Sequence, residues 1–488
     1  MNRFDKVFLI NPPVGAHYGA LRPPAGLGYI AQTLWQHGVE YKVLDMLLGY
    51  RYADLRQKIA AFNPRVIGLT MFTIGYQSTY TLIRKLKEDF PQILIIVGGP
   101  HVSTMRNQVL EECKEIDLGM VMESEETWIE LCGGENIKDI KGIIYRNNGR
   151  VISNGEREFV EDLDQIPFPR YEKFELDRYI KERVIVSSRG CPYNCIYCPV
   201  SLTIGKKLRM RSPKSVVEEI AYWYKRRFNQ FNFVDDNFTF HKDRVYGICD
   251  EIIKKRLDGL FLRLSNGVRA DKVDKDLLKR MREVGFRQLA FGVEAGNDKV
   301  LRRLRKGEKI NQISQAIEDA CNLGYDVYLF FLVGSLGETW TDLVDSVNLA
   351  LKYPISRVCF YNIIPYPKTP LFDWLWERGY FVESPESYLN SASSEGKNAR
   401  PVFITPELNL HQRKRALRYT RKIERRVLRA STKRMLRELN IPGIVSDLIG
   451  YFASRDIIQR LLFKNIALRK VAEGIRFKAK CSTDKVIL

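Results

Sequence analysis

A chain of 488 residues is longer than one ordinary hydrophobic core can organise, so its length predicts two or three domains. Hydrophobic residues make up 45% of it, which is ordinary for a globular protein with packed interiors. The formal net charge of +20 is concentrated near the C-terminus: residues 401–488 contain 21 Lys and Arg against 7 Asp and Glu, whereas the first 400 residues contain 57 against 51. No apolar run approaches the roughly 18–20 residues of a membrane-spanning helix, which argues against such a segment.

The N-terminus and the cysteines indicate the compartment. Residues 1–10 lack the pattern of a secretory signal and run directly into an expected strand. Nine cysteines, three of them tightly clustered, favour reduced thiols and a metal site over a disulfide framework. We therefore expect a cytoplasmic protein, with peripheral contact to the membrane as an open alternative.

The first 140 residues alternate short apolar runs with helix-length segments such as Gly26–His37 and Gln77–Phe90. This pattern predicts a flavodoxin-like parallel sheet with helices on both faces. Residues 141–180 follow as a hairpin around Asn148-Gly149 and a linker. The expected strands are Lys6–Ile10, Tyr41–Asp45, Val66–Thr70, Ile93–Val97 and Leu118–Met122.

A second alternation of strands and helices occupies residues 181–380. Six such units in succession favour a partial (β/α)6 barrel of the TIM type over an open sheet. Residues 384–399 are expected to form a loop, and the remainder of a basic helical region at 381–488 follows, with a break at Pro442-Gly443. The expected barrel strands are Arg183–Ser188, Phe231–Asp235, Phe261–Ser265, Gln288–Val293, Asp326–Val333 and Arg357–Ile363.

Three cysteines follow the first barrel strand with the spacing C-x3-C-x2-C: Cys191, Cys195 and Cys198. Thiolates are the usual ligands of iron–sulfur clusters, and normally there are four of them. Three ligands would leave one iron open to a substrate. A zinc site is the main alternative, but it requires four ligands, and no Cys or His lies between Cys198 and His241.

In this motif, the chain resembles the radical S-adenosylmethionine (SAM) superfamily, whose signature is C-x3-C-x-aromatic-C after the first barrel strand. The resemblance implies a 4Fe-4S cluster on the three cysteines, SAM bound to the open iron, and reductive cleavage of SAM to a 5′-deoxyadenosyl radical. Tyr197 occupies the aromatic position that packs near the adenine in the family. Two turns are similar to G-x-P-G-E-T and P-Y-P-G-T-P-L, except that Leu336 replaces the Pro of the first and Lys368 the Gly of the second.

Polar residues at the ends of later strands are candidates for binding SAM. Asp235 or Asp236 could accept a hydrogen bond from the α-ammonium group, Arg269 could pair with the carboxylate, and Glu294 could hold the ribose hydroxyls. The alternative is that the acidic residues cap helices and that Arg269 forms an ordinary surface ion pair. Their placement on successive strand ends favours a role in the site, because barrel active sites are built there. No catalytic side chain is assigned.

The N-terminal domain carries a second set of candidates, because open parallel sheets bind ligands at the carboxyl ends of their strands. The order N-P-P, P-x-G-L-x-Y-x-A, G-L-T and V-G-G-P-H resembles the cobalamin-binding domain that precedes many radical SAM barrels. Together with the barrel, the resemblance covers roughly residues 4–375. Leu47 stands where that family has a cobalt-binding His, which implies cobalamin without this imidazole ligand. The alternative is that the glycines form tight turns and that His101 caps a helix. The candidate cobalamin-binding residues are Asn11, Asp45, Thr70, Gly98, Gly99 and His101.

Residues 408–439 predict an amphipathic basic helix. Its apolar stripe could pack over the barrel opening, or it could meet an anionic bilayer and deliver a lipid-like substrate. Nucleic acid binding is disfavoured because aromatic residues that could stack on bases are sparse among the charges.

Together these features predict a cobalamin-dependent radical SAM enzyme that methylates an unactivated carbon of a small, apolar or lipid-like substrate, with an electron donor such as flavodoxin or ferredoxin. One alternative is an anaerobic oxidative cyclase or another radical rearrangement without net methyl transfer. Another is a non-catalytic metal-binding module. A methylthiotransferase is disfavoured, since Cys113 and Cys132 are the only cysteines of the first domain and cannot form a second three-cysteine cluster.

Overall fold

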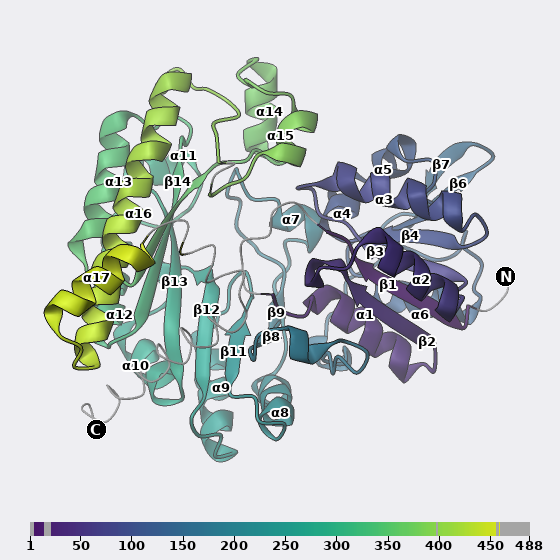
Figure 1. Cartoon of the computed structure of the whole chain (residues 1–488), viewed down its shortest axis with the longest axis horizontal. Coiled ribbons are helices and arrows are strands. Elements are labelled where there is room, and N and C mark those ends of the chain that lie inside the picture. The colour runs from purple at the N-terminus through teal and green to yellow at the C-terminus, as the bar shows by residue number, and fades with distance from the viewer. Residues whose placement is uncertain (1–3, 14–20, 397–398, 455–457, 459–488) are drawn as a thin grey trace.

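The computed structural model describes residues 4–13, 21–396, 399–454 and 458. They form an N-terminal α/β body and a larger body in which long strands are flanked by helices (Figure 1). The fold class predicted from the sequence is confirmed: a Rossmann-type parallel sheet, a partial barrel and a helical C-terminal region. Among the described residues, no helix is long and apolar enough to cross a membrane.

The N-terminal sheet has the strand order β2-β1-β3-β4-β5-β6-β7 within the described residues. The first five strands are parallel; β1, β3, β4 and β5 are almost wholly buried, as expected for a sheet covered on both faces by helices, and the edge strand β2 is half-buried. The hairpin β6–β7 adds antiparallel to β5. The strands are β1 (Lys6–Asn11), β2 (Glu40–Asp45), β3 (Val66–Thr70), β4 (Leu94–Gly98), β5 (Leu118–Met120), β6 (Ile143–Asn147) and β7 (Arg150–Ser153). The helices are α1 (Ala25–Gln36), α2 (Tyr52–Phe62), α3 (Tyr76–Asp89), α4 (Pro100–Met105), α5 (Asn107–Glu112) and α6 (Glu125–Gly133).

The second sheet consists of parallel strands in the order β15-β14-β13-β12-β11-β8. The first and last strands do not pair, so the barrel is partial. The strands are β8 (Arg183–Ile185), β11 (Gln230–Phe233), β12 (Phe261–Val268), β13 (Phe286–Glu294), β14 (Asp326–Val333) and β15 (Arg357–Asn362). The helices that alternate with them are α8 (Pro213–Tyr224), α9 (Lys242–Lys254), α10 (Lys275–Glu283), α11 (Asp298–Arg303), α12 (Ile310–Asn322) and α13 (Trp340–Lys352).

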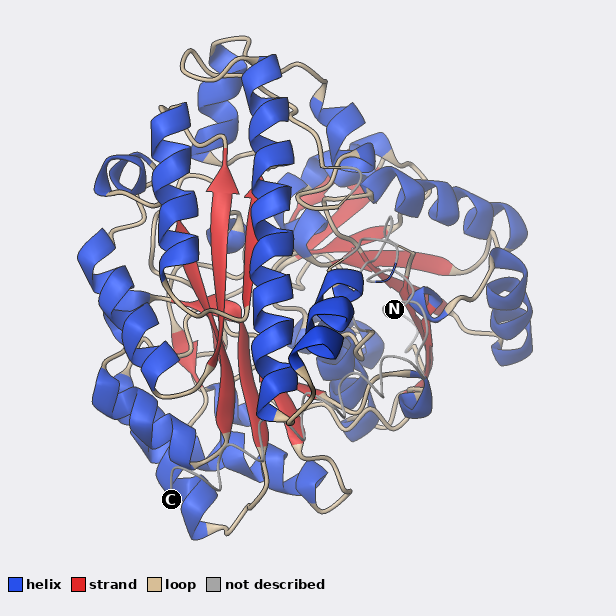
Figure 2. Ribbon diagram, turned by 60° about the vertical axis from the view of Figure 1, so that its left-hand side comes forward, coloured by secondary structure: helices blue, strands red, loops and turns tan. Residues whose placement is uncertain are grey.

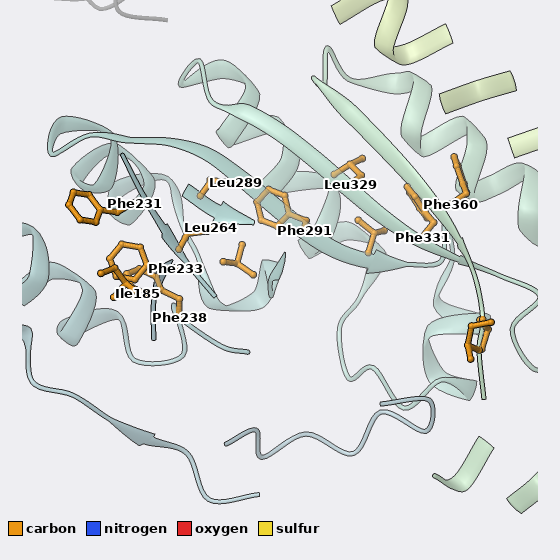
Figure 3. Close-up of a cluster of buried hydrophobic side chains, with 14 of the residues drawn as sticks. Ile185, Phe231, Phe233, Phe238, Leu264, Leu289, Phe291, Leu329, Phe331 and Phe360 are labelled. Carbon is orange, nitrogen blue, oxygen red and sulfur yellow. The ribbon is translucent and has the colours of Figure 1, made fainter. Parts of the chain in front are cut away.

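Aromatic and aliphatic side chains from successive strands form the core of this second body (Figure 3). The rings of Phe331 and Phe360 stack across β14 and β15 with centroids 4.9 Å apart, and Phe233 stacks on Phe286 at 5.7 Å. Burying such large rings is the main favourable contribution to folding. The result is a rigid base beneath the carboxyl ends of the strands, where the candidate site residues lie.

The C-terminal region is helical, with α14 (Pro370–Glu377), α15 (Pro385–Ser391), α16 (Leu410–Glu438) and α17 (Gly443–Ala453). The expectation of a loop over 384–399 is wrong for α15, which Ser384 caps through Ser387 N and which has Pro at its first position. The remainder of the predicted basic region, residues 455–457 and 459–488, lies outside the described residues.

Helix α16 packs along the edge strand β15 and against α13 (Figure 2), so its apolar stripe is buried against the protein, at the edge of the sheet. Its buried face includes Ala416, Leu417, Ile423 and Val427. Glu424 Oε1 also accepts a hydrogen bond of 2.6 Å from the backbone nitrogen of Phe360 on β15. The helix therefore covers a strand edge that would otherwise expose unpaired backbone groups.

Candidate active site

The cysteine loop begins at a tight turn after β8. A short antiparallel ribbon, β9 (Ser188–Arg189) with β10 (Arg209–Met210), precedes the turn and closes the loop. Gly190 has φ of +95°, and a Cβ atom there would overlap the carbonyl of Lys207. Only glycine tolerates both conditions. The turn delivers the chain directly into Cys191, whose backbone nitrogen donates to Gly205 O at 3.2 Å.

Asp235, at the end of β11, holds the start of this loop. Its Oδ1 accepts hydrogen bonds from the backbone nitrogens of Ser187 and Ser188 at 2.6 and 2.8 Å, and its Oδ2 accepts from Ser187 Oγ. The side chain is 3% exposed. Because both oxygens are occupied, Asp235 positions the backbone that leads to the cysteines.

The three thiols suit a group larger than one metal ion. Cys191, Cys195 and Cys198 are free, and Asn237 Nδ2 donates to Cys191 Sγ at 3.1 Å. In the part of the chain that the structure describes, no three His, Cys, Asp or Glu side chains are arranged to hold a single ion. Cys195 and Cys198 also line a cavity of about 800 Å³. Three free thiols beside such a space fit a 4Fe-4S cluster with one open iron better than a closed zinc site.

Burial opposes ionisation of these thiols. It raises the pKa of Cys198 to about 12 and also raises the pKa values of Cys191 and Cys195. Metal ligands must be deprotonated, so the protein alone does not prepare thiolates here. The positive charge of bound iron is what would hold these sulfurs as thiolates.

A buried group of charges lies behind the loop, and two of its members were not predicted from the sequence. Lys306 Nζ lies 3.1 Å from Glu294 Oε1 and 3.5 Å from Glu308 Oε2. Burial lowers the pKa of Lys306, but the two carboxylates outweigh it and the net shift is upward, so Lys306 is charged. Lys306 and Glu308 come from the loop after α11, which carries no recognisable motif.

Arg269 lies beside this group with its nitrogens already bonded. It holds both oxygens of Asp271, at 2.9 and 3.1 Å, and its Nη1 donates to Lys306 O at 2.6 Å. Its guanidinium also lies 3.7 Å from the ring centre of Tyr193, between the first two cysteines. This arrangement makes Arg269 a support for the cysteine loop, and its predicted contact with the SAM carboxylate stays a prediction, because each Nη carries a second N–H.

Asp236 differs from its neighbour Asp235, because its carboxylate has a hydrogen bond from its own backbone nitrogen and no hydrogen bond or ion pair with another described residue. Burial, and then the charge of Asp235, raise the pKa of Asp236 to about 6. Tyr197 lies against Glu294. Burial, and then the charge of Glu294, raise the pKa of Tyr197. The structure therefore brings Asp236, Tyr197 and Glu294 to the surroundings of the cysteines.

Three residues around the cavity have left-handed backbones although they are not glycine. They are Glu294 with φ of +65°, Arg305 with +52° and Lys368 with +62°. Such conformations cost about 1–2 kcal/mol each and persist where surrounding contacts impose them, which is common at functional sites. At Lys368, the turn keeps the geometry that the glycine of the P-Y-P-G-T-P-L pattern would adopt.

The candidate cobalamin residues meet at the carboxyl ends of β1, β2, β3 and β4. Asn11 Nδ2 donates to Asp45 Oδ1 at 2.8 Å, and Tyr179 from the linker donates to Asp45 Oδ2 at 2.8 Å. These strand ends lie where the strand order reverses around β1, the usual ligand position in an open α/β sheet.

The two glycines after β4 are not equivalent. Gly99 has φ of +100°, and an added Cβ would lie 2.9 Å from Thr70 Oγ1 and 3.0 Å from Met71 O. An added Cβ at Gly98 would meet only ordinary contacts, the nearest at 3.7 Å. Gly99 thus lets the loops after β3 and β4 approach closely.

His101 does not cap a helix, contrary to the alternative interpretation of the sequence. The N-cap residue of α4 is Gly99, and His101 lies in the first turn with its ring stacked on Tyr76 at 4.6 Å between centroids. Its Nε2 is 3.5 Å from Tyr80 Oη, and its Nδ1 has no partner among the described residues. Burial lowers the pKa of His101 to about 4, so the ring is neutral at pH 7.

Buried ion pairs join the cysteine loop to the N-terminal domain. Arg209 holds both oxygens of Glu123 at 2.8 Å, and Arg189 lies 3.1 Å from Glu123 and 2.6 Å from Glu125. Helix α7 (Val200–Thr203), directly after the cysteines, packs on α4 (Figure 1). The loop for the cluster and the loop after β4 are therefore neighbours in space.

Comparison with known proteins identifies both halves of this arrangement. A sequence model of the Radical SAM superfamily matches residues 185–350, and one of the B12 binding domain matches residues 12–131. An uncharacterized methyltransferase of Pyrococcus horikoshii is 29% identical over 76% of this chain and 83% of its own. The anaerobic magnesium-protoporphyrin IX monomethyl ester cyclase of Rubrivivax gelatinosus is 28% identical over 76% and 70%.

Among solved structures, the cobalamin-dependent S-adenosylmethionine radical enzyme OxsB with aqua-cobalamin bound shares the fold. It superposes with a TM-score of 0.74 over 96% of this chain and 75% of its own, at 16% sequence identity.

The neutral state of His101 predicts that acid destabilises the fold. Between about pH 6.5 and 4 the unfolded chain binds a proton that the folded chain excludes, so stability falls as the pH drops. The parent should lose more unfolding free energy between pH 7 and pH 5 than His101→Gln does, by about 2 kcal/mol. Urea unfolding at the two pH values measures this difference. The exposed His37→Gln variant is the control. Equal pH dependence in the parent and His101→Gln would contradict the assignment.

Proposed function

Because the chain belongs to the radical SAM superfamily and carries a B12-binding domain ahead of its barrel, we propose that it is a cobalamin-dependent methyltransferase. Its substrate would be an unactivated carbon of a small, apolar or lipid-like molecule. The observation that carries the proposal is the contact between α7 and α4, together with the ion pairs of Glu123 and Glu125. This contact brings a three-thiol loop next to the loops of the cobalamin-binding fold.

The cofactors would supply the reactive chemistry and the protein their placement. When bound, the cluster supplies the electron that splits SAM into methionine and a 5′-deoxyadenosyl radical, and cobalamin supplies the methyl group. Cys191, Cys195 and Cys198 would hold the cluster. Asn11 and Asp45, with the backbone of Thr70, Gly98 and Gly99, would line the corrin, and His101 would support that loop from beneath. Leu47, in place of a histidine, would leave cobalt without an imidazole from this position, which suits methyl transfer.

Asp236 is the carboxylate that we assign to the SAM α-ammonium, because Asp235 has no free oxygen. Tyr197 would pack near the adenine and Glu294 would hold the ribose hydroxyls from its left-handed turn at the end of β13. Arg269 would act through Tyr193, by fixing the loop between the first two cysteines.

Substitution of Asp235 and of Asp236 should have different effects on the protein. Asp236→Asn removes a charge-assisted hydrogen bond, so we expect SAM affinity to fall about tenfold, corresponding to roughly 1.5 kcal/mol, while iron and sulfide content stay unchanged. Asp235→Asn should instead reduce the iron content after anaerobic reconstitution, because it weakens the anchor of the loop. Iron analysis and equilibrium binding of SAM measure both effects. Equal iron loss in the two variants would contradict the division of roles.

Products and cofactor retention test the function itself. The reconstituted chain, incubated with hydroxocobalamin, desalted and supplied with SAM, a reductant and substrate, should release S-adenosylhomocysteine together with 5′-deoxyadenosine. Cys191→Ala should abolish 5′-deoxyadenosine while the corrin absorption is retained. Gly99→Val should lose the corrin and keep the iron, whereas Gly98→Ala, which meets no close contact, should keep both.

The similarity to an anaerobic cyclase favours a second candidate, radical cyclisation without net methyl transfer. Product analysis separates the two: 5′-deoxyadenosine alone, with substrate consumed, would contradict methylation and support the cyclase. A non-catalytic module would be indicated if the reconstituted chain held iron and sulfide but did not cleave SAM, and full iron, sulfide and cleavage in Cys191→Ala would contradict the cluster assignment. Cys191, Cys195 and Cys198 are free thiols, and a cluster on them would need a reducing compartment such as the cytoplasm.

An external electron donor would meet the cavity beside the cluster. Lys206, Arg302, Arg305 and Lys368 are exposed around it, and in the described part of the chain none of them forms an ion pair. Unpaired cations on the rim would attract an acidic carrier and orient it toward Cys195 and Cys198. Flavodoxin or ferredoxin fits this requirement.

Substitutions of the exposed cations around the cavity should distinguish docking of the electron donor from SAM cleavage. Lys368→Gly combined with Arg302→Glu removes rim charge, and the glycine relieves the left-handed backbone, so folding should be preserved. We expect flavodoxin-supported SAM cleavage to fall about tenfold, with cleavage supported by dithionite unchanged. Lys279→Glu on α10 is the exposed control. Loss of both activities together would contradict a docking role.

A further inference from the structure

Helix α17 faces the solvent with its apolar side. Ile444 is 80% exposed, Leu448 55% and Phe452 55%, at the i, i+4 and i+8 positions of one face. Val445, Ile449 and Tyr451 extend this face and are also exposed. A surface helix normally turns such a face inward. Single exposed apolar residues are common, whereas a contiguous patch of this kind marks an interaction site.

The residues on the opposite side of α17 explain this orientation. Ser446 and Gly450 are buried, and a Cβ atom at Gly450 would already lie 3.2 Å from Arg429 O of α16. Lys433 pairs with Asp447 at 2.7 Å, which fixes the rotation of α17 on α16. The small residues allow the two helices to approach closely, and the large apolar ones are thereby held outward.

The surface next to this patch is strongly basic. Residues 410–454 contain twelve Lys and Arg against three Asp and Glu. Of these acids, Glu424 is bonded to the β15 backbone and Asp447 to Lys433. A cavity of about 500 Å³ lies in the angle between α16 and α17, and its lining includes Lys422, Arg425, Arg426, Arg429 and Lys433. Anions would be drawn to the rim of the apolar patch.

We propose that this α16–α17 surface docks on an anionic lipid bilayer. The apolar face of α17 enters the interface between headgroups and acyl chains, and lipid phosphates contact the basic cavity beside it. An apolar helical face flanked by Lys and Arg is the combination that binds anionic membranes without spanning them. The proposal goes beyond the enzymatic function and does not depend on it.

A second copy of the chain, residues 455–488 and a nucleic acid each match the patch less well than an anionic bilayer does. A second copy of this chain would bring two basic surfaces together, which is unfavourable. Residues 455–488 contain nine Lys and Arg against three Asp and Glu, so this segment is not complementary either. A nucleic acid would match the charge, but it would leave the aliphatic side chains Ile444, Val445, Leu448 and Ile449 without a suitable partner.

Vesicle binding by the full chain tests the proposal. At 150 mM salt, the parent should sediment with vesicles of phosphatidylcholine and phosphatidylglycerol at 7:3 and not with pure phosphatidylcholine. Ile444→Glu combined with Leu448→Glu should lower partitioning at least tenfold. Arg426→Glu combined with Arg429→Glu should also lower it and reduce its dependence on salt. Ile253→Glu on α9, where Ile253 is 48% exposed, is the matched control and should change nothing.

A second measurement does not rely on loss of binding. Phe452→Trp should give a tryptophan emission that shifts to the blue when anionic vesicles are added, beyond any change in the parent. The proposal is overturned if the parent fails to bind anionic vesicles, or if Ile444→Glu with Leu448→Glu binds as the parent does. A concentration-dependent dimer in gel filtration that this double variant abolishes would assign the surface to a second copy instead.

Discussion

Buried charge holds the cysteine loop in place from two sides, and the geometry of both cofactor sites depends on it. Asp235 bonds the backbone just before the loop, and Glu123 and Glu125 bind Arg189 and Arg209 from the N-terminal domain. Paired groups of this kind are costly to separate, because a partner left alone would keep its charge in a poorly solvated place. Moving one domain relative to the other would therefore require these ion pairs to break. The two domains thus hold the two cofactor sites in a fixed relative position.

Within this frame, the residues that support the site are distinct from those free to bind a ligand. The partners of Arg269 and Asp235 lie within the protein, whereas the half-buried carboxylate of Asp236 has no hydrogen bond or ion pair with another described residue. Beside the cysteine loop, a carboxylate of this kind is the one that a ligand can complete. The same reasoning applies to Nδ1 of His101 beneath the cobalamin-side loop.

Much of the architecture follows from local sequence patterns, and the rest depends on contacts that no pattern records. Short buried strands alternating with helices predicted both sheets, because hydrophobic periodicity is a local property. The cysteine spacing predicted the loop for the same reason. Lys306 and Glu308 were missed, since only the folding of the loop after α11 brings them to Glu294. Helix α15 was missed because its polar composition masked the Ser-Pro signal at its start. The orientation of α17 depends on its packing against α16 and could not be predicted from an apolar stripe alone.

Lys368 occupies its turn at a cost to the backbone. A glycine there would adopt the left-handed backbone freely, and it is the residue that the resembling pattern carries. Glycine would relieve about 1 kcal/mol of backbone strain at this position. Lys368 carries that strain on the lining of the cavity, so the proposed role of its ammonium group lies outside folding. In related chains, the identity of this one residue should therefore vary with the partner that each enzyme meets at the cavity, rather than with the temperature at which its host lives.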